Sequence, residues 1–531
     1  MRGMSRKFIL GLVLFLSMVL IAACGGGGGE DEASSTESEG QTEEEKEEST
    51  EVESDLPQEV RVAVTTEALG LSPTETWDGA SATVLIQLYE TLVARDPESG
   101  EIVPFLAESF ETVDDTTWIF NLREGINFHD GTPFNAEAVK YTFEKLVDPE
   151  TAAPAAHILS FMKEIEVEDE YTIKLTTHEP SPNVLPMLAS ESAAIISPEA
   201  DQSQNLMQEP VGTGPFKFVE WIQGDRIVLE KNEDYWGDVT AIESLTFITV
   251  PDSNTAVSML EAKEIDLYDL AEPALVPRVE AMIDVDTILQ PGSPAYYFSF
   301  NTQKEPMNEV EFRKAVAMAI DVDSFIDTLD GTGFKSPGMF GPAVLDYDEV
   351  SEGWGYDYDP DAARQIVEEN GYGDYELTIF STDQGGYKRQ AEVAHANLTE
   401  IGLNVTMEQM EWGTLLERTT DGDHDMFVLG SSNSMTGLET MYGYFHTDSI
   451  GANNRTQHSN EEFDKLVDEA RRTVDDEARQ ALINEAHEML VEEVFMVNMY
   501  HSVNMLAHDK TLHDVTLLPT GRFLLKDAYR K

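Results

Sequence analysis

The stretch "LAESFETVDDTTWIFNLREGINFHDGTPFNAEAVKYTFEKL", residues 106–146, predicts a strand, two turns and a helix within one short length of chain. The run Trp-Ile-Phe-Asn-Leu at 118–122 is typical of a strand. Gly125 and the run Asp-Gly-Thr-Pro at 130–133 predict the turns, because glycine accepts positive φ and proline presets φ. Asn135 is a suitable N-cap, and apolar residues at helical spacing follow it, which predicts the helix.

Strand and helix patterns alternate along the rest of the chain. Strands are predicted at residues 60–64, 166–168, 172–175, 377–381, 404–408 and 426–429. Helices are predicted at residues 82–93, 310–320, 360–369, 387–401, 461–474 and 477–491. Residues 216–229 predict a hairpin with its turn at Gly224 and Asp225. This mixed order predicts an α/β fold, and the sequence shows no internal repeat.

The first 24 residues have the layout of a secretory signal peptide. Arg2, Arg6 and Lys7 precede an apolar run over 8–20, which is shorter than the roughly 20 apolar residues of a membrane-spanning helix. The run leads into Ile21-Ala22-Ala23-Cys24, which resembles the lipobox read by lipoprotein signal peptidase. The resemblance implies cleavage before Cys24 and lipidation of this cysteine. A short N-terminal anchor helix is the alternative.

Cys24 is the single cysteine of the chain, so an internal disulfide is excluded. Residues 25–55 after it are mostly Gly, Ser, Thr and Glu, a composition that cannot bury enough apolar surface to fold. Their like charges repel and extend the chain. This segment is predicted to be a disordered tether between the lipid and the folded part.

The folded part is long and strongly acidic. Residues 57–531 exceed one domain of about 100–200 residues, which predicts about two to four lobes. The formal net charge of the chain is −67, and this excludes nucleic acid as a partner, because binding it requires a basic face. The acid could attract cationic ligands. We favour the other interpretation, a solubility adaptation to high salt, where screening removes self-repulsion.

Catalytic motifs are missing from the sequence. There is no Gly-x-Ser-x-Gly elbow, no Walker loop and no His-Glu-x-x-His motif. Gly212 and Gly214 form an isolated Gly-x-Gly that is followed by Pro215. His424 lies between Asp423 and Asp425, but the abundance of acid explains this cluster without a metal. We therefore expect no cofactor, no metal and no catalytic residue, which favours a binding protein over an enzyme.

Three segments together carry a family resemblance. They are residues 106–146, "VGTGPFKFVEWIQGDRIVLEKNEDYWG" at 211–237, and "FNTQKEPMNEVEFRKAVAMAID" at 300–321. In this order and at these distances they resemble the family 5 extracellular solute-binding proteins of ABC importers. That group captures dipeptides, oligopeptides, glutathione and nickel complexes. The resemblance covers about residues 59–518.

The resemblance implies a two-lobed α/β receptor of the periplasmic-binding-protein type (class II, cluster C), which closes on its ligand like a hinged trap. Its chain crossings would fall near residues 296–301 and 496–500. The implied parts are a signal peptide at 1–23, the lipidated cysteine with its tether at 24–56, lobe I at 57–295 with an inserted subdomain at about 82–182, lobe II at 296–497, and a return to lobe I at 498–531.

The resemblance also implies where the ligand binds. The family's pocket includes the loop after the first strand, the segment matching residues 410–413, and the loop matching 430–439. Trp118, Trp221, Tyr235 and Trp236 are expected in the core instead. The residues expected to bind ligand are Leu71, Ser72, Trp412, Ser431, Ser432, Asn433 and Glu439.

Two departures separate this sequence from dipeptide receptors. Those receptors carry an aspartate in the loop matching 430–439, where it pairs with the peptide's α-ammonium. Glu439 is the only acid in this loop here. They also place an arginine near the position of Ser381 to hold the ligand's carboxylate, and here the nearby Arg389 begins a helix. Ser431, Ser432 and Asn433 suit hydrogen bonding to a peptide backbone.

The expected function is that of a monomeric, lipid-anchored receptor for a peptide or peptide-like solute. It would face the extracellular side of the cell membrane, or the periplasm where an outer membrane exists, and deliver its ligand to an ABC permease. Two alternatives remain: a receptor for a nickel chelate or another small solute, and a receptor that senses its ligand without importing it.

Overall fold

The computed structural model of the protein describes residues 56–97, 100–270, 272–329, 331–382, 386–431 and 436–531. The predictions for Cys24, Ser432 and Asn433 lie outside these residues. Within these ranges, no helix combines the length and the apolar character needed to cross a bilayer.

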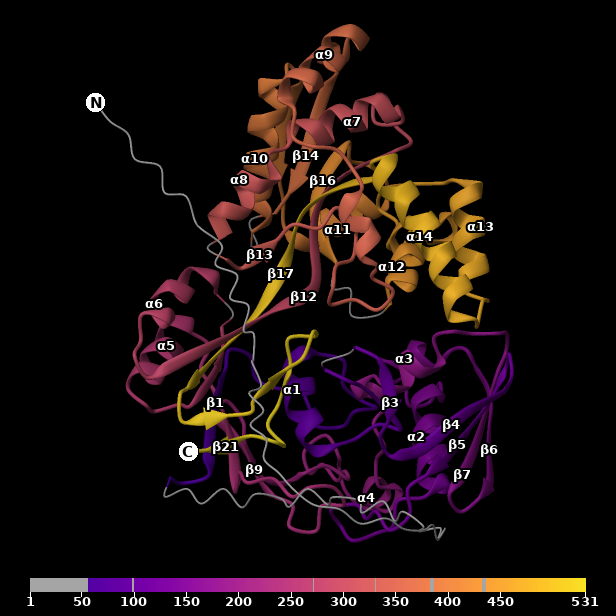
Figure 1. Ribbon diagram of the computed structural model, residues 1–531, viewed down its shortest axis with the longest axis vertical. Coiled ribbons are helices and arrows are strands. Elements are labelled where there is room, and N and C mark those ends of the chain that lie inside the picture. Colours follow the sequence, from indigo (N-terminus) through magenta and orange to yellow (C-terminus); the bar gives the residue numbers. More distant parts are fainter. Residues whose placement is uncertain (1–55, 98–99, 271, 330, 383–385, 432–435) are drawn as a thin grey trace, which may run out of the picture. The chain divides into compact units, whose positions relative to one another are not determined.

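A mixed sheet of 11 strands runs through the described part of the chain (Figure 1). Its centre is a long antiparallel pair, β12 (Val285–Phe300) and β17 (Met496–Asp509). Beyond β17 follow, in order, β11 (Leu267–Asp269), β1 (Glu59–Val64), β10 (Ser244–Thr249), β9 (Arg226–Lys231) and β8 (Phe216–Ile222). Beyond β12 follow β16 (Met426–Ser431), β14 (Glu376–Ser381) and β15 (Asn404–Gln409), while β13 (Gly333–Phe334) pairs with β17.

The hydrophobic cores divide this sheet into two parts. Two clusters of buried side chains draw on residues 60–285 and 505–528, and they cover opposite faces of the strands there. Two further clusters draw on residues 297–499 and cover the other strands in the same way. We name the first part lobe I and the second lobe II. The α/β class is confirmed, and the exact domain limits stay a prediction.

Helices cover both faces of the sheet. The described helices of lobe I are α1 (Gly79–Leu88), α2 (Ala136–Val147), α3 (Val184–Leu188), α4 (Pro198–Ser203), α5 (Ser253–Glu261) and α6 (Val276–Glu280). Those of lobe II are α7 (Val310–Ala319), α8 (Val322–Ile326), α9 (Pro360–Asn370), α10 (Tyr387–Glu400), α11 (Trp412–Thr420), α12 (Gly437–Phe445), α13 (Glu461–Ala470) and α14 (Asp476–Glu492).

The stretch at 106–146 folds as its sequence predicts. It forms β4 (Ala107–Asp114), β5 (Thr117–Leu122) and α2, and the side chain of Asn135 accepts a hydrogen bond from the Ala138 backbone at 3.1 Å. With β6 (Met162–Asp169) and β7 (Thr172–Thr177) it makes a separate four-stranded antiparallel sheet. Three short pairs complete the strands: β2 (Val93–Arg95) with β3 (Ile102–Pro104), β18 (Leu512–His513) with β21 (Tyr529–Arg530), and β19 (Thr516–Leu517) with β20 (Phe523–Leu524).

A buried carboxylate fixes the segment at 211–237 to the core through hydrogen bonds. Glu90, which follows α1, is only 4% exposed. It accepts hydrogen bonds from Thr213 Oγ1 at 2.8 Å, Tyr235 Oη at 2.6 Å and Trp236 Nε1 at 2.7 Å. Burial raises the pKa of Glu90 to about 7. The expectation that Tyr235 and Trp236 serve the scaffold is therefore confirmed.

The glycines beside Thr213 serve close packing. A Cβ on Gly214 would lie 2.7 Å from the Leu88 carbonyl oxygen, and one on Gly212 would collide with the same atom. Neither glycine has positive φ. Glycine is therefore needed at both positions because the chain passes directly against the end of α1.

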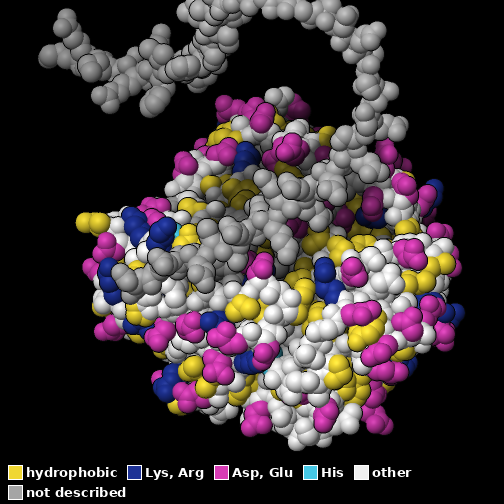
Figure 2. Space-filling view, turned by 60° about the horizontal axis from the view of Figure 1, so that its bottom comes forward, with side chains coloured by type: hydrophobic (Ala, Val, Ile, Leu, Met, Phe, Trp, Pro, Cys, Tyr) yellow, Lys and Arg dark blue, Asp and Glu magenta, His cyan; other side chains and the backbone are white. Residues whose placement is uncertain are grey.

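Acidic side chains are scattered over the visible face of the described part (Figure 2). Basic side chains are fewer there and lie among the acidic ones. This distribution does not single out one acidic patch as a site.

Candidate functional site

Regular pairing of the two central strands is interrupted at one place, which we name the crossing (residues 291–295 and 501–503). Pro291 lies opposite Val503, and Ala295 lies opposite His501. The extra residues of β12 form a bulge, which bends a strand. A Cβ on Gly292 would meet Ser502 Oγ at 2.7 Å, so the two strands approach closely here.

The crossing lies at the carboxyl ends of strands from both lobes. In lobe I, β11 ends at Asp269 opposite Leu506, and β1 runs parallel to it. In lobe II, β16 ends at Ser431 opposite Ala295, and β14 runs parallel to it. In open α/β sheets, ligands bind in the crevice outside the carboxyl ends of the strands. The topology therefore points to the crossing as the candidate site.

Four aromatic side chains of lobe II form a row at this edge, which we name the aromatic wall. Trp412 stacks on Tyr387 with ring centroids 5.6 Å apart. Tyr387 lies 5.8 Å from Tyr296, which stacks face to face on Tyr500 at 4.5 Å. All four side chains are half-buried, so part of each remains open to solvent. Such a surface can pack against apolar ligand groups and against cations.

Local structure brings the wall together. Tyr387 and Trp412 are the first residues of α10 and α11, and the Met410 backbone, just before α11, bonds to the Ser381 carbonyl at the end of β14. Tyr296 of β12 lies between Gly430 of β16 and Tyr500 of β17.

The hydroxyl groups of the wall remain neutral near pH 7. Burial raises the pKa of Tyr387 to about 12, helped by the neighbouring Tyr296 and Tyr444. Burial also raises the pKa of Tyr296 and of Tyr500. Each phenol can therefore donate or accept a hydrogen bond without carrying charge.

The loop after β1 presents residues other than the expected ones. Leu71 and Ser72 are fully buried, with the Leu71 backbone bonded to the Met207 carbonyl at 3.0 Å. In this structure neither side chain reaches solvent. Leu69 and Trp77 on the same loop are 74% and 45% exposed. The apolar side chains that this loop can offer to a ligand are therefore Leu69 and Trp77.

Glu439 already has partners from two directions. Its Oε1 accepts hydrogen bonds from Arg471 Nε at 2.9 Å and from Asn183 Nδ2 at 2.7 Å. Arg471 lies just after α13 of lobe II, and Asn183 precedes α3 of lobe I. A carboxylate that is paired in this way is poorly placed to hold a ligand's ammonium group as well. Ser431 is buried at the end of β16.

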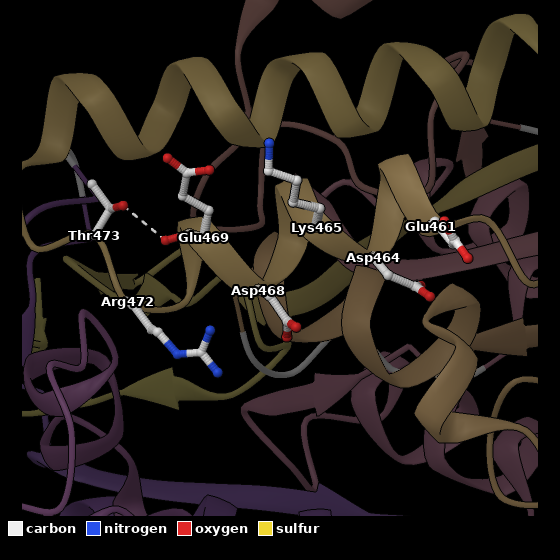
Figure 3. Close-up of a pocket in the computed structure, with 7 residues that line it drawn as sticks. All are labelled: Glu461, Asp464, Lys465, Asp468, Glu469, Arg472 and Thr473. Atoms are coloured by element: carbon white, nitrogen blue, oxygen red, sulfur yellow. Dashed lines mark hydrogen bonds between the residues drawn. The ribbon is translucent and has the colours of Figure 1, made fainter.

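Two pockets lie away from the crossing. One is a groove of about 590 Å³ along α13. Lys465 and Glu469 project to one side of this helix and Asp468 to the other (Figure 3). The lining of the groove comes from residues 461–473 alone and offers no apolar wall. The second pocket, of about 300 Å³, includes Glu439 and Arg471. The first pocket suits solvent and ion pairs, whereas the second is lined by residues of both lobes and includes the apolar side chains of Ile158, Phe161 and Met187.

No cluster of metal-ligating side chains occurs in the described ranges. His424 is fully buried, and burial lowers its pKa to about 3. Its acidic neighbours have cationic partners: Arg418 binds Asp423 at 2.8 Å, and Lys304 binds Asp425 at 3.4 Å. In the described structure, His424 is therefore a core residue, and the two acids beside it take part in ion pairs with Arg418 and Lys304.

Sequence reasoning named Trp412 but missed Tyr296, Tyr387 and Tyr500 as a group. A signal was present, because Tyr296 and Tyr500 fall at the two stretches expected to cross between lobes. Tyr387 directly follows the loop after the strand predicted at 377–381. The stacking of Tyr296 on Tyr500 depends on the register of β12 and β17, which the sequence alone does not reveal.

The family model for bacterial extracellular solute-binding proteins, family 5 Middle, matches residues 101–453. Among curated proteins, the chain is 30% identical over 437 residues to heme-binding protein A of Haemophilus influenzae, covering 76% of this chain and 79% of that protein. It is 28% identical over 482 residues to di/tripeptide-binding protein 1 of Pseudomonas aeruginosa, covering 84% and 88%.

Solved structures are similar as well. HbpA2 from Haemophilus parasuis gives a TM-score of 0.83 at 26% identity, over 89% of this chain and 100% of that one. The periplasmic binding protein DppA from Helicobacter pylori, in complex with the peptide STSA, gives 0.70 at 27% identity, over 89% and 98%. The protein therefore belongs to the family 5 bacterial extracellular solute-binding proteins.

Proposed function

We propose that this protein is the substrate-binding component of an ABC importer that captures extracellular peptides or peptide-like solutes and catalyses no reaction. The observation that carries the proposal is the aromatic wall at the meeting point of strand ends from both lobes. Relatives described as di/tripeptide-binding and dipeptide-binding proteins support the peptide class. Closure of the two lobes about the crossing would bury the ligand and create the form that a permease recognises.

The experiment is a thermal melt of the full-length protein in detergent, with panels of peptides, glutathione, haem and a nickel–histidine chelate. A ligand at 100 times its Kd adds about 2.7 kcal/mol to the free energy of unfolding. We expect peptides to raise the Tm and the nickel chelate to leave it unchanged. A shift with the chelate or haem, and none with any peptide, would contradict the peptide class.

Import is separated from sensing by an uptake measurement. Cells that lack this protein should lose uptake of the labelled peptide and regain it with the wild-type gene. Normal uptake without the protein would favour the sensing alternative.

We also propose that Cys24 carries the lipid anchor and that residues 25–55 are a tether. Two or more acyl chains hold a protein stably on a membrane, whereas one holds it only marginally. In the Cys24→Ser variant, we expect labelled palmitate not to be incorporated and the protein to leave the membrane fraction. Membrane retention of a full-length, unlabelled Cys24→Ser protein would instead support an anchor helix. Ala23→Ser, which keeps a small residue before the cysteine, is the matched control.

A further inference from the structure

Asp269 lies beside the crossing, at the end of a lobe I strand. It is the last residue of β11, beside the end of β1 and opposite Leu506 of β17. Residues alternate between the faces of a strand, so Asp269 shares a face with buried Leu267, while Tyr268 packs into the other core. A charged side chain therefore ends a strand whose other side chains are buried.

The carboxylate of Asp269 is exposed to solvent, so a ligand can reach it. Loss of hydration raises the pKa of this carboxyl group to about 6. Among the described residues, no charged group contributes to this shift and none donates a hydrogen bond or an ion pair to the carboxylate.

Other acidic groups of the neighbouring loops have partners. Glu67, in the loop after β1, accepts hydrogen bonds from Trp221 Nε1 at 2.9 Å and from the Gly224 backbone at 2.7 Å. Glu439 is held by Arg471 and Asn183. Many other acids on the described surface of this protein also lack partners. Asp269 differs from them because it lies near the place where β1 and β11 of lobe I and β14 and β16 of lobe II end.

A carboxylate without a partner at a ligand crevice is suited to a cation, because a charge-assisted hydrogen bond strengthens when water is excluded. The aromatic wall across the crossing complements this preference, since its rings can attract a cation and its phenols are neutral. Building on the proposed function, we propose that Asp269 binds the ammonium group of the ligand, the task that the sequence assigned to Glu439.

The register also bears on ligand length. Leu506, opposite Asp269, and Tyr500 of the wall are six residues apart on β17, a contour of about 20 Å. A dipeptide spans only about 7 Å. The contour of a bent strand is an upper limit to this separation, and side chains reach toward the ligand from both ends, so tetrapeptides of about 14 Å are suitable probes.

The test compares Asp269→Asn with Glu264→Gln by calorimetric titration. Glu264 is an exposed acid before the amino end of β11, so its replacement makes the same change in net charge away from the crossing. Three probes separate the sources of the ammonium group: tetraalanine, N-acetyl-tetraalanine, and N-acetyl-tetraalanine with one lysine in place of alanine.

We expect Asp269→Asn to weaken binding of a probe that carries an ammonium group by about 10- to 100-fold, and to leave binding of N-acetyl-tetraalanine unchanged. A loss of affinity for tetraalanine identifies the α-ammonium group as the partner of Asp269. A loss of affinity for the lysine probe identifies a side-chain ammonium group instead. Glu264→Gln should change none of these affinities by more than about 2-fold. Equal effects of Asp269→Asn on all probes, or none, would overturn the inference.

A polyamine distinguishes this inference from the proposed function. If the wild-type protein bound no peptide but bound spermidine in an Asp269-dependent way, the peptide function would fail and the role of Asp269 would stand. If it bound neither the charged peptides nor spermidine through Asp269, the inference would be overturned. The Tm of unliganded Asp269→Asn should not fall, because the substitution removes a partly desolvated charge.

Discussion

Replacing Trp412 with alanine is expected to weaken ligand binding by about 10- to 100-fold. Trp412 ends the aromatic wall and stacks on Tyr387, so its loss removes a rigid apolar surface and leaves Tyr387 without its stacking partner. The side chain is half-buried at the first position of α11, and Glu411 still caps that helix. The variant should therefore stay folded, and calorimetric titration with the ligand found in the melt should show the loss.

The matched control is Trp354→Ala. Trp354 is also a half-buried tryptophan of lobe II, but it packs edge-on against His487, with ring centroids 5.3 Å apart, away from the wall. It should lower stability without changing affinity. Trp412→Phe should recover part of the affinity. Wild-type affinity in a folded Trp412→Ala protein would place the ligand elsewhere.

The largest effect on stability is expected from Arg313→Met, which should lower the free energy of unfolding by about 3–5 kcal/mol. Arg313 of α7 is only 3% exposed. Its Nε donates to the carbonyls of Glu493 and Val494 at 2.9 and 3.0 Å, and its Nη1 donates to that of Met307 at 2.9 Å. Methionine keeps the apolar volume but leaves these carbonyls without a donor.

Urea unfolding at constant salt measures this loss, with Lys314→Met as the control. Lys314 is the next residue along α7, and its ammonium group pairs with the more exposed Glu311 at 3.2 Å and lies 5.8 Å from the centre of the Tyr356 ring. We expect the control to change stability by less than about 0.5 kcal/mol. A loss below about 1 kcal/mol for Arg313→Met would show that water replaces the guanidinium. Because the hydrogen bonds of Arg313 go to the backbone carbonyls of Met307, Glu493 and Val494, outside the crossing and the aromatic wall, ligand affinity should not change while the protein is folded.

Two of the segments that carry the family resemblance are held in place by buried charged residues, Arg313 and Glu90. Arg313 lies in the segment at 300–321, and Glu90 organises the segment at 211–237 from within the core. Both serve the scaffold. The proposed ligand contacts, Trp412 and Asp269, lie outside those segments, at strand ends whose loops can vary without disturbing the core.

The sequence by itself determined most of the local structure and the fold class. The cap at Asn135, the hairpin of β8 and β9, and the limits of α7 and α10 agree with the patterns, because capping, turns and hydrophobic period depend on residues a few positions apart. The resemblance of three segments was enough to predict the two-lobed architecture of the relatives.

Only the tertiary structure decided how the candidate site is composed. Glu439 looked available in the sequence, yet it is held by Asn183, which is 256 residues away in the chain. Leu71 was expected to bind ligand and its side chain is buried, whereas Leu69 on the same loop is exposed. The wall joins residues from 296 to 500, and Asp269 became notable only beside the crossing. Burial and partnership depend on contacts between distant parts of the chain, and no local pattern encodes them.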